Sequence, residues 1–199
     1  MGRKQTSKHV PLDELVIRRA TPARWRDLER LFGPRGACGG CWCMYWRLRR
    51  SEYEKKKGAG NRRALKRLVE SGAVPGLIAY AAGEPIGWCA IAPRDQLPVL
   101  ENSRILSRVD DQPVWSVPCF YIARPWRGRG VTLALLKAAA AEARRRGARI
   151  LEGYPIEPKG GRTADAFAWT GLASTFRKAG FKEVARRSPT RPLFRGQFT

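Results

Sequence analysis

The sequence predicts a single α/β domain built on a mixed sheet. The chain has 199 residues, the length of one ordinary domain, and 43% hydrophobic residues supply a core without disulfides. Strand-like apolar runs alternate with stretches of helical periodicity, the pattern of an α/β fold. No internal repeat or change of composition marks a second domain. We therefore expect a flexible basic tail over residues 1–10 and one domain over residues 11–199.

Each element follows from a local pattern. Thr21 and Pro22 open the first helix, and Asn61 is expected to cap a later helix that Gly72 ends. Gly83 and Glu84 separate two apolar runs in the manner of a β-hairpin. The predicted strands are 15–19, 76–82, 85–92, 114–123, 149–154, 181–187 and 192–198, and the predicted helices begin near residues 21, 51, 61, 131 and 171.

The charge balance indicates a negatively charged binding partner. There are 39 Lys and Arg against 17 Asp and Glu, a net charge of +22, which favours nucleic acid, a phosphorylated cofactor or an acidic surface as a partner. Residues 45–70 alone hold ten basic and three acidic residues, with Trp42, Tyr45, Trp46 and Tyr53 beside or among them. Such a mixture can stack bases and follow phosphates. The alternative is a solvated helix face with the aromatic rings turned into the core.

Histidine and cysteine usage excludes several kinds of site. His9 is the only histidine, which argues against Ser-His-Asp and Cys-His catalysis and against most zinc hydrolase sites. The five cysteines include a lone Cys38-x-x-Cys41 with Cys43 close by, too few ligands for a closed zinc site. We expect reduced, metal-free thiols in a cytoplasmic protein. No run approaches the ~18 apolar residues of a membrane span, so we expect no membrane contact.

The most informative stretch is the strand, glycine turn and helix at 119–147. Gly128 and Gly130 allow the backbone to approach a ligand closely, and the following helix presents its free N–H groups. Arg127 and Arg129 add positive charge beside that helix end. This combination favours phosphate binding, although a plain strand-to-helix turn would also use two glycines.

This turn resembles the acetyl-CoA pyrophosphate loop of the GNAT N-acetyltransferase superfamily, Arg/Gln-x-x-Gly-x-Gly/Ala. Arg127 and Gly130 match, and Thr132 stands at the last position. The hairpin AAGEPIGWCAI (81–91) and the late segment FRKAGFKEVAR (176–186) match as well, so the resemblance covers about residues 16–198 in the right order. It implies a central mixed, mostly antiparallel sheet with helices on both faces.

The resemblance implies transfer of an acetyl group from acetyl-CoA to an amine of a small molecule, peptide or protein, by direct attack on the thioester and without a metal. The strands at 114–123 and 149–154 would splay apart to admit the pantetheine arm. The run 42–46 would form a lid or wall over the acceptor pocket. The implied cofactor-binding residues are Phe120, Ile122, Arg127, Gly128, Arg129, Gly130, Val131, Thr132 and Phe176.

The acid and base are predicted from their position in the expected strands. An ammonium of pKa ~10.4 must lose a proton before it attacks, and Glu152 is our candidate base. Its alternative role is a surface carboxylate paired with an arginine. Phe176 stands where the superfamily commonly has a tyrosine acid, so Tyr154 is the candidate acid, with Tyr121 or Cys119 as substitutes.

Two other classes of function stay open at the level of sequence. One is a nucleic-acid- or ribosome-associated protein on the same fold, which acts on an RNA-borne acceptor or only binds. The other is a zinc or redox module built on Cys38, Cys41 and Cys43.

Overall fold

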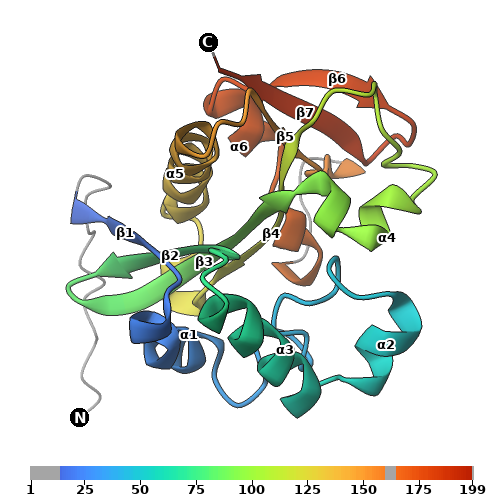
Figure 1. Ribbon diagram of the computed structural model, residues 1–199. Coiled ribbons are helices and arrows are strands. Elements are labelled where there is room, and N and C mark those ends of the chain that lie inside the picture. Colours follow the sequence, from blue (N-terminus) through green and yellow to red (C-terminus); the bar gives the residue numbers. More distant parts are fainter. Residues whose placement is uncertain (1–13, 160–164, 199) are drawn as a thin grey trace.

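A seven-stranded sheet runs through the protein in the computed structural model, which describes residues 14–159 and 165–198 (Figure 1). The predicted tail 1–10 and residues 160–162 of the Pro- and Gly-rich segment lie outside the described residues. The strands are β1 Val16–Arg19, β2 Gly76–Ala81, β3 Glu84–Pro93, β4 Trp115–Ile122, β5 Ile150–Gly153, β6 Lys182–Arg186 and β7 Pro192–Gln197. The helices are α1 Trp25–Phe32, α2 Arg50–Lys55, α3 Ala59–Glu70, α4 Pro98–Glu101, α5 Val131–Arg145 and α6 Ala173–Lys178, with short 3-10 helices at Pro22–Arg24, Arg94–Gln96, Arg124–Trp126 and Asp165–Thr170.

The strand order is β1-β2-β3-β4-β5-β7-β6. Of the six pairs of neighbouring strands in this sheet, β4 with β5 is parallel and the other five are antiparallel. Sequential strands pair directly as far as β4: β2 and β3 form a hairpin, whereas α1, α2 and α3 lie between β1 and β2. The parallel step from β4 to β5 needs a crossover, and α5 supplies it. The predicted mixed, mostly antiparallel sheet is confirmed.

Helices cover both faces of this sheet, as predicted (Figure 1). The apolar residues of α5 and α6 pack on one face, and those of α1, α3 and the segment between α1 and α2 pack on the other. The helix α5 lies especially close to the sheet at Gly87, where an added Cβ would be 3.0 Å from the side chain of Val131. This close contact fixes the first turn of α5 against β3.

One local prediction differs from the structure, and one short helix was not predicted. Asn61 is not a helix cap: α3 begins at Ala59, and the buried Asn61 side chain donates a hydrogen bond to the carbonyl of Gly40, 3.2 Å away. The short helix α4 has no periodic pattern to announce it, because four residues are about one turn. Within the described part of the chain, no helix is long and apolar enough to cross a membrane.

Candidate active site

The strands β4 and β5 separate after three paired residues. Trp115 to Val117 of β4 face Leu151 to Gly153 of β5, and β4 then continues to Ile122 without β5 beside it. The cause is a β-bulge in β4. Ser116 and Cys119, three residues apart on β4, pair with Ala92 and Ala90, which are only two residues apart on β3. Such a bulge bends a strand and increases its twist. The predicted splay of these two strands is present.

A cavity of about 810 Å³ opens at this separation. It is bounded by the end of β4, the glycine turn, the start of α5, α6 and the segment between α1 and α2. The described lining residues are Ala37, Cys38, Cys41, Cys43, Tyr45, Trp46, Tyr53, Cys119, Phe120, Tyr121, Ile122, Trp126, Arg127, Gly128, Gly130, Val131, Thr132, Leu133, Ala168, Trp169, Gly171, Leu172, Thr175 and Lys178.

The glycine turn has the geometry that its sequence predicts. Gly128 and Gly130 have φ angles of 71° and 80°, in the left-handed region that favours glycine, and α5 begins at the next residue. No side chain caps this helix end, so the N–H groups of its first turn are available to a ligand. The Arg127 Nε donates to the carbonyl of Ile122 at 3.1 Å, and Arg129 lies over the ring of Trp126.

Seven of the nine predicted cofactor-binding residues line the cavity, while Arg129 and Phe176 do not. Phe176 is fully buried behind the cavity, where its ring lies edge-on to Phe120 and Phe181. It also presses on β5, because a Cβ on Gly153 would lie 2.1 Å from its Cε1. Phe176 therefore supports the place where the strands separate, and a direct contact with a cofactor stays a prediction.

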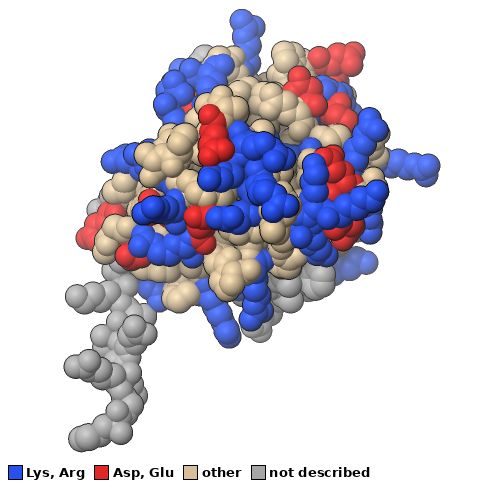
Figure 2. All heavy atoms as spheres, turned by 60° about the horizontal axis from the view of Figure 1, so that its bottom comes forward, with Lys and Arg blue, Asp and Glu red and all other residues tan. Residues whose placement is uncertain are grey.

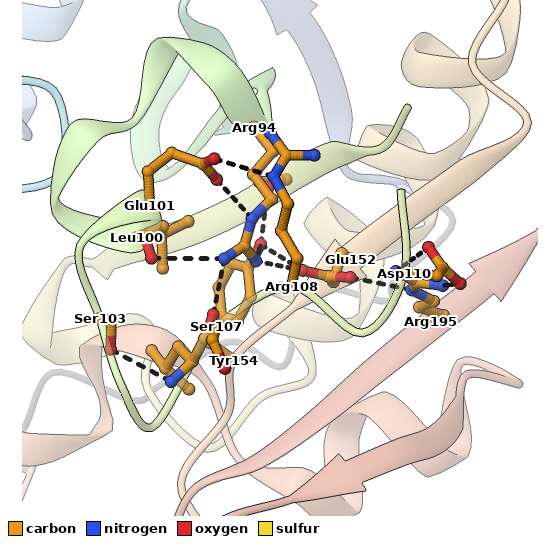
Figure 3. A network of polar contacts seen from close by, with 12 residues as sticks. Arg94, Leu100, Glu101, Ser103, Ser107, Arg108, Asp110, Glu152, Tyr154 and Arg195 are labelled. Atoms are coloured by element: carbon orange, nitrogen blue, oxygen red, sulfur yellow. Dashed lines mark hydrogen bonds and ion pairs between the residues drawn. The ribbon is translucent and has the colours of Figure 1, made fainter. Parts of the chain in front are cut away.

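Glu152 lies in a buried network of charges (Figure 3). One carboxylate oxygen accepts hydrogen bonds from Arg94 Nη1 at 2.5 Å and from the Tyr154 hydroxyl at 2.8 Å. The other accepts from Arg195 Nε at 2.8 Å. The side chains of Glu152 and Tyr154 are fully buried and do not line the cavity. Burial, together with the Glu152 charge, raises the pKa of Tyr154 well above its usual value.

The same network ties three parts of the chain together. Arg94 also donates to Glu101 at 2.7 Å and to the carbonyl of Leu106 at 2.6 Å, and Arg195 donates to Asp110 at 2.6 Å (Figure 3). It thus joins the segment 94–110 to β5 and β7. Removing one partner of a buried ion pair leaves an unpaired charge and costs several kcal/mol. The network supports a structural role for Glu152, and its role as a base stays a prediction.

The segment between α1 and α2 supplies an aromatic and cysteine-lined wall. Tyr45 lies edge-on to Trp46, Tyr53 and Trp169, with ring centroids 5.0 to 5.5 Å apart. Trp42 instead stacks on Trp25, away from the lining. Of the run 42–46, Cys43, Tyr45 and Trp46 therefore line the cavity, and a place over the acceptor stays a prediction. Trp169 was not predicted, because it stands in a stretch with no recognisable period.

Four cysteines complete this wall. Cys38, Cys41 and Cys43 come from one segment and Cys119 from β4. The sulfur atoms of Cys43 and Cys119 are 3.1 Å apart. Within residues 14–159 and 165–198, no three His, Cys, Asp or Glu side chains come close enough to hold a metal ion.

Basic side chains gather on the face that carries α1 to α3, with single acidic residues between them (Figure 2). Several are paired within the protein, as Arg62 is with Glu29 and Lys66 with Glu70. Trp42, Trp46 and Tyr53, which the sequence offered as base-stacking residues, are buried. They are therefore not available as a stacking platform on this surface.

Known proteins share this arrangement. The sequence matches the profile of the acetyltransferase (GNAT) family over residues 42–155, more than half of the chain. No curated protein sequence matches the chain.

Solved structures of low sequence identity share the fold. The PaiA N-acetyltransferase of Thermoplasma acidophilum, in complex with coenzyme A, is 12% identical with a TM-score of 0.53, over 92% of this chain and 99% of that one. YncA of Salmonella typhimurium, with its cofactor acetyl-CoA, is 15% identical with a TM-score of 0.54, over 94% and 95%. A ribosomal-protein-alanine N-acetyltransferase of Brucella melitensis is 18% identical with a TM-score of 0.51, over 92% and 99%. With its splayed parallel strands and its glycine turn at a helix start, this chain belongs to the GNAT acetyltransferase family and is an enzyme of that type.

Proposed function

We propose that this enzyme transfers an acetyl group from acetyl-CoA to an amine, by direct attack of the amine on the thioester. The observation that carries the proposal is the single cavity wall that runs from the start of α5, along the open end of β4, to the aromatic segment. One end of this wall suits an anion and the other an apolar acceptor. The thioester carries the acetyl group in an activated form, so the enzyme needs no covalent nucleophile.

The donor end is proposed on charge and backbone geometry. Gly128 and Gly130 turn the chain so that the first N–H groups of α5 face a ligand, and the helix dipole adds partial positive charge there. Arg127 and Lys178 line the same cavity. We propose that Val131 and Thr132 belong to this pyrophosphate site, and that backbone groups of Phe120 and Ile122 hold the pantetheine arm.

The acceptor end is proposed on its aromatic lining. Tyr45, Trp46, Tyr53 and Trp169 surround it, and burial raises the pKa of Tyr53 to about 12. The Trp46 indole N–H is buried and has no hydrogen-bond partner among the described residues. None of the described lining residues carries a carboxylate. Such a wall stacks on an aromatic or apolar body and offers no carboxylate to pair with an ammonium, so the acceptor we propose is an apolar, weakly basic amine.

The donor end is tested with Gly130→Asp. The substitution places a negative charge at the start of α5, where phosphate is proposed to bind. Titration calorimetry should show that acetyl-CoA affinity falls at least tenfold. Gly147→Asp is the matched control, because Gly147 has a φ of 81° at the other end of α5 and lies outside the cavity lining. Equal affinity in the wild type and in Gly130→Asp would contradict the proposed site.

The acceptor end is tested by CoA release from a panel of amines. We expect arylamines, whose nitrogen is attached directly to the ring and is weakly basic, to react faster than polyamines or lysine peptides. Trp169→Ala should raise KM for the aromatic acceptors and leave KM for acetyl-CoA unchanged. A preference for polyamines that survives this substitution would contradict the acceptor class.

A further inference from the structure

Cys43 and Cys119 bring two thiols together inside the cavity wall. Cys43 belongs to the segment between α1 and α2, and Cys119 lies on β4 just beyond its bulge. Their Sγ atoms are 3.1 Å apart, and both residues line the cavity. All five cysteines of the chain are described, and this is the one contact between two of their sulfur atoms. A disulfide bond would require the two atoms to approach by only about 1 Å.

The surroundings of Cys43 favour its ionised form. Its sulfur accepts a hydrogen bond from Trp88 Nε1 at 2.9 Å and is hydrogen-bonded to the Cys119 sulfur 3.1 Å away. These bonds, and the charge of the nearby Arg47, lower the pKa of Cys43. The hydrogen bond to Cys43 and burial raise the pKa of Cys119. Cys43 is therefore the more readily ionised of the two thiols, which suits Cys43 to attack and Cys119 to resolve.

The backbone holds Cys43 in this position. Trp42 and Cys43 have φ angles of 44° and 56°, a backbone conformation that residues other than glycine rarely adopt. Packing stabilises it, because the Trp42 ring stacks on Trp25 and meets Phe32 edge-on. The Cys43 sulfur is therefore placed by its surroundings rather than by a freely moving loop.

The remaining cysteines have different environments. Cys41 donates to the carbonyl of Gly36, and burial raises its pKa to about 11. Cys89 is fully buried, donates to the carbonyl of Leu135, and has a pKa raised by burial. Cys38 is exposed, with no described contact to another sulfur. These residues serve as internal controls for the reactivity of the pair.

We propose that Cys43 and Cys119 form a peroxide-sensitive thiol pair in the wall of the cavity. The Cys43 thiolate attacks one oxygen of a hydroperoxide, an S–O bond forms as the O–O bond breaks, and the other oxygen leaves as water or an alcohol after taking a proton. The Cys119 sulfur then attacks the sulfenic acid, the S–O bond breaks, and water leaves as the disulfide forms. Two thiols are oxidised by two electrons and the peroxide is reduced.

The disulfide would join the segment between α1 and α2 to β4 across the cavity wall. It would also remove the thiolate from the lining. A thiol reductant restores the pair by exchange, so the change is reversible. The proposal concerns the chain's own sulfur chemistry and does not require that the acetyl-transfer assignment be correct.

The test is peroxide titration of the reduced full-length protein, followed by intact mass and by peptide mapping without reduction. We expect the wild type to lose two hydrogen atoms with one equivalent of hydrogen peroxide, to give a cross-linked peptide pair containing Cys43 and Cys119, and to return to its starting mass with dithiothreitol. Cys89→Ser should behave like the wild type. Cys119→Ser should stop at a Cys43 sulfenic acid that dimedone traps, and Cys43→Ser should give no cross-link to Cys119.

The wild-type map is decisive even where a variant fails to fold. A cross-link between other cysteines, or dimedone labelling of Cys38 with Cys43 unmodified, would overturn the proposal. The acetyl-transfer assay of the reduced protein is read separately. Its failure would overturn the proposed function and leave the cross-link result standing.

Discussion

Replacing Glu152 by Gln separates its structural role from its predicted catalytic role. Glutamine keeps the shape of the side chain and removes its charge, so Arg94 and Arg195 each lose a buried anionic partner. Arg94 keeps Glu101 and two carbonyls, and Arg195 keeps Asp110. Breaking a buried ion pair costs about 3–5 kcal/mol of unfolding free energy. For a chain of this length that corresponds to a Tm lower by roughly 6–20 °C.

The catalytic prediction adds a second effect. If Glu152 takes the proton of the amine, turnover of the folded variant should fall by about 10²–10⁴ at neutral pH. Part of that loss should return at high pH, where the amine is already neutral. A purely structural Glu152 leaves the pH–rate profile of the folded variant unchanged.

Calorimetry measures the loss of stability. CoA release, assayed about 10–15 °C below the variant's own Tm so that the variant is folded, measures the loss of turnover separately. Glu101→Gln is the matched control, because Glu101 binds the same Arg94 from a half-exposed position. An unchanged Tm in Glu152→Gln would refute the network as a source of stability. An unchanged pH–rate profile would refute Glu152 as the base.

Three further predictions concern stability and binding. Burial alone would raise the pKa of Glu142, but hydrogen bonds from Arg145, Arg146 and Arg19 lower it to about 2. The stability that Glu142 contributes is therefore complete above about pH 4.5 and is lost as the pH falls toward 2. In urea titrations, Glu142→Gln should make the unfolding free energy depend less on pH in that window. Gly153→Ala should cost about 1–3 kcal/mol in denaturant unfolding, because its Cβ would lie 2.1 Å from Phe176, and Phe176→Leu in the same chain should return part of it. If the protein binds single-stranded RNA through the exposed face of α3, the double variant Arg63→Glu with Arg67→Glu should weaken that binding in fluorescence anisotropy and lower its salt slope by about 0.7 per lost phosphate contact. An unchanged slope would exclude this face.

Local patterns were sufficient for most helices and strands and for the glycine turn, and the family resemblance supplied the arrangement of the sheet. The glycine turn is set by Gly128 and Gly130. Glycine adopts positive φ angles without help from a neighbouring element. The start of α5 follows directly from this turn. Hairpins and amphipathic helices are equally local, so the seven strands and the longer helices were predicted in the right order, while α4 was missed.

Contacts between distant residues could not be predicted in the same way. Asn61 has a cap-like composition, yet its partner is the carbonyl of Gly40, 21 residues earlier. Cys43 meets Cys119 across 76 residues, although a sequence reading naturally compares Cys43 with Cys41. Both depend on how the segment between α1 and α2 folds back on the sheet, which no periodicity encodes.

Glu152 shows why a strand position alone does not define a catalytic role. A one-residue change of register moves a side chain to the other face of a sheet, and the partners of Glu152 lie 58 and 43 residues away. The sequence alternative of a carboxylate paired with arginine is present, but in a buried rather than a surface form.

The absence of a carboxylate among the described cavity-lining residues limits the acceptors that the enzyme can use. An ordinary alkylamine of pKa ~10.4 is neutral in only about one molecule in 2,500 at pH 7, so an enzyme without a nearby base loses that factor in rate. An apolar wall recovers part of it, because desolvation disfavours the ammonium and lowers the pKa of a bound amine. If Glu152→Gln leaves the pH–rate profile unchanged, the rate at neutral pH should therefore rise as the basicity of the acceptor falls. Weakly basic aromatic amines should then need no protein base at all.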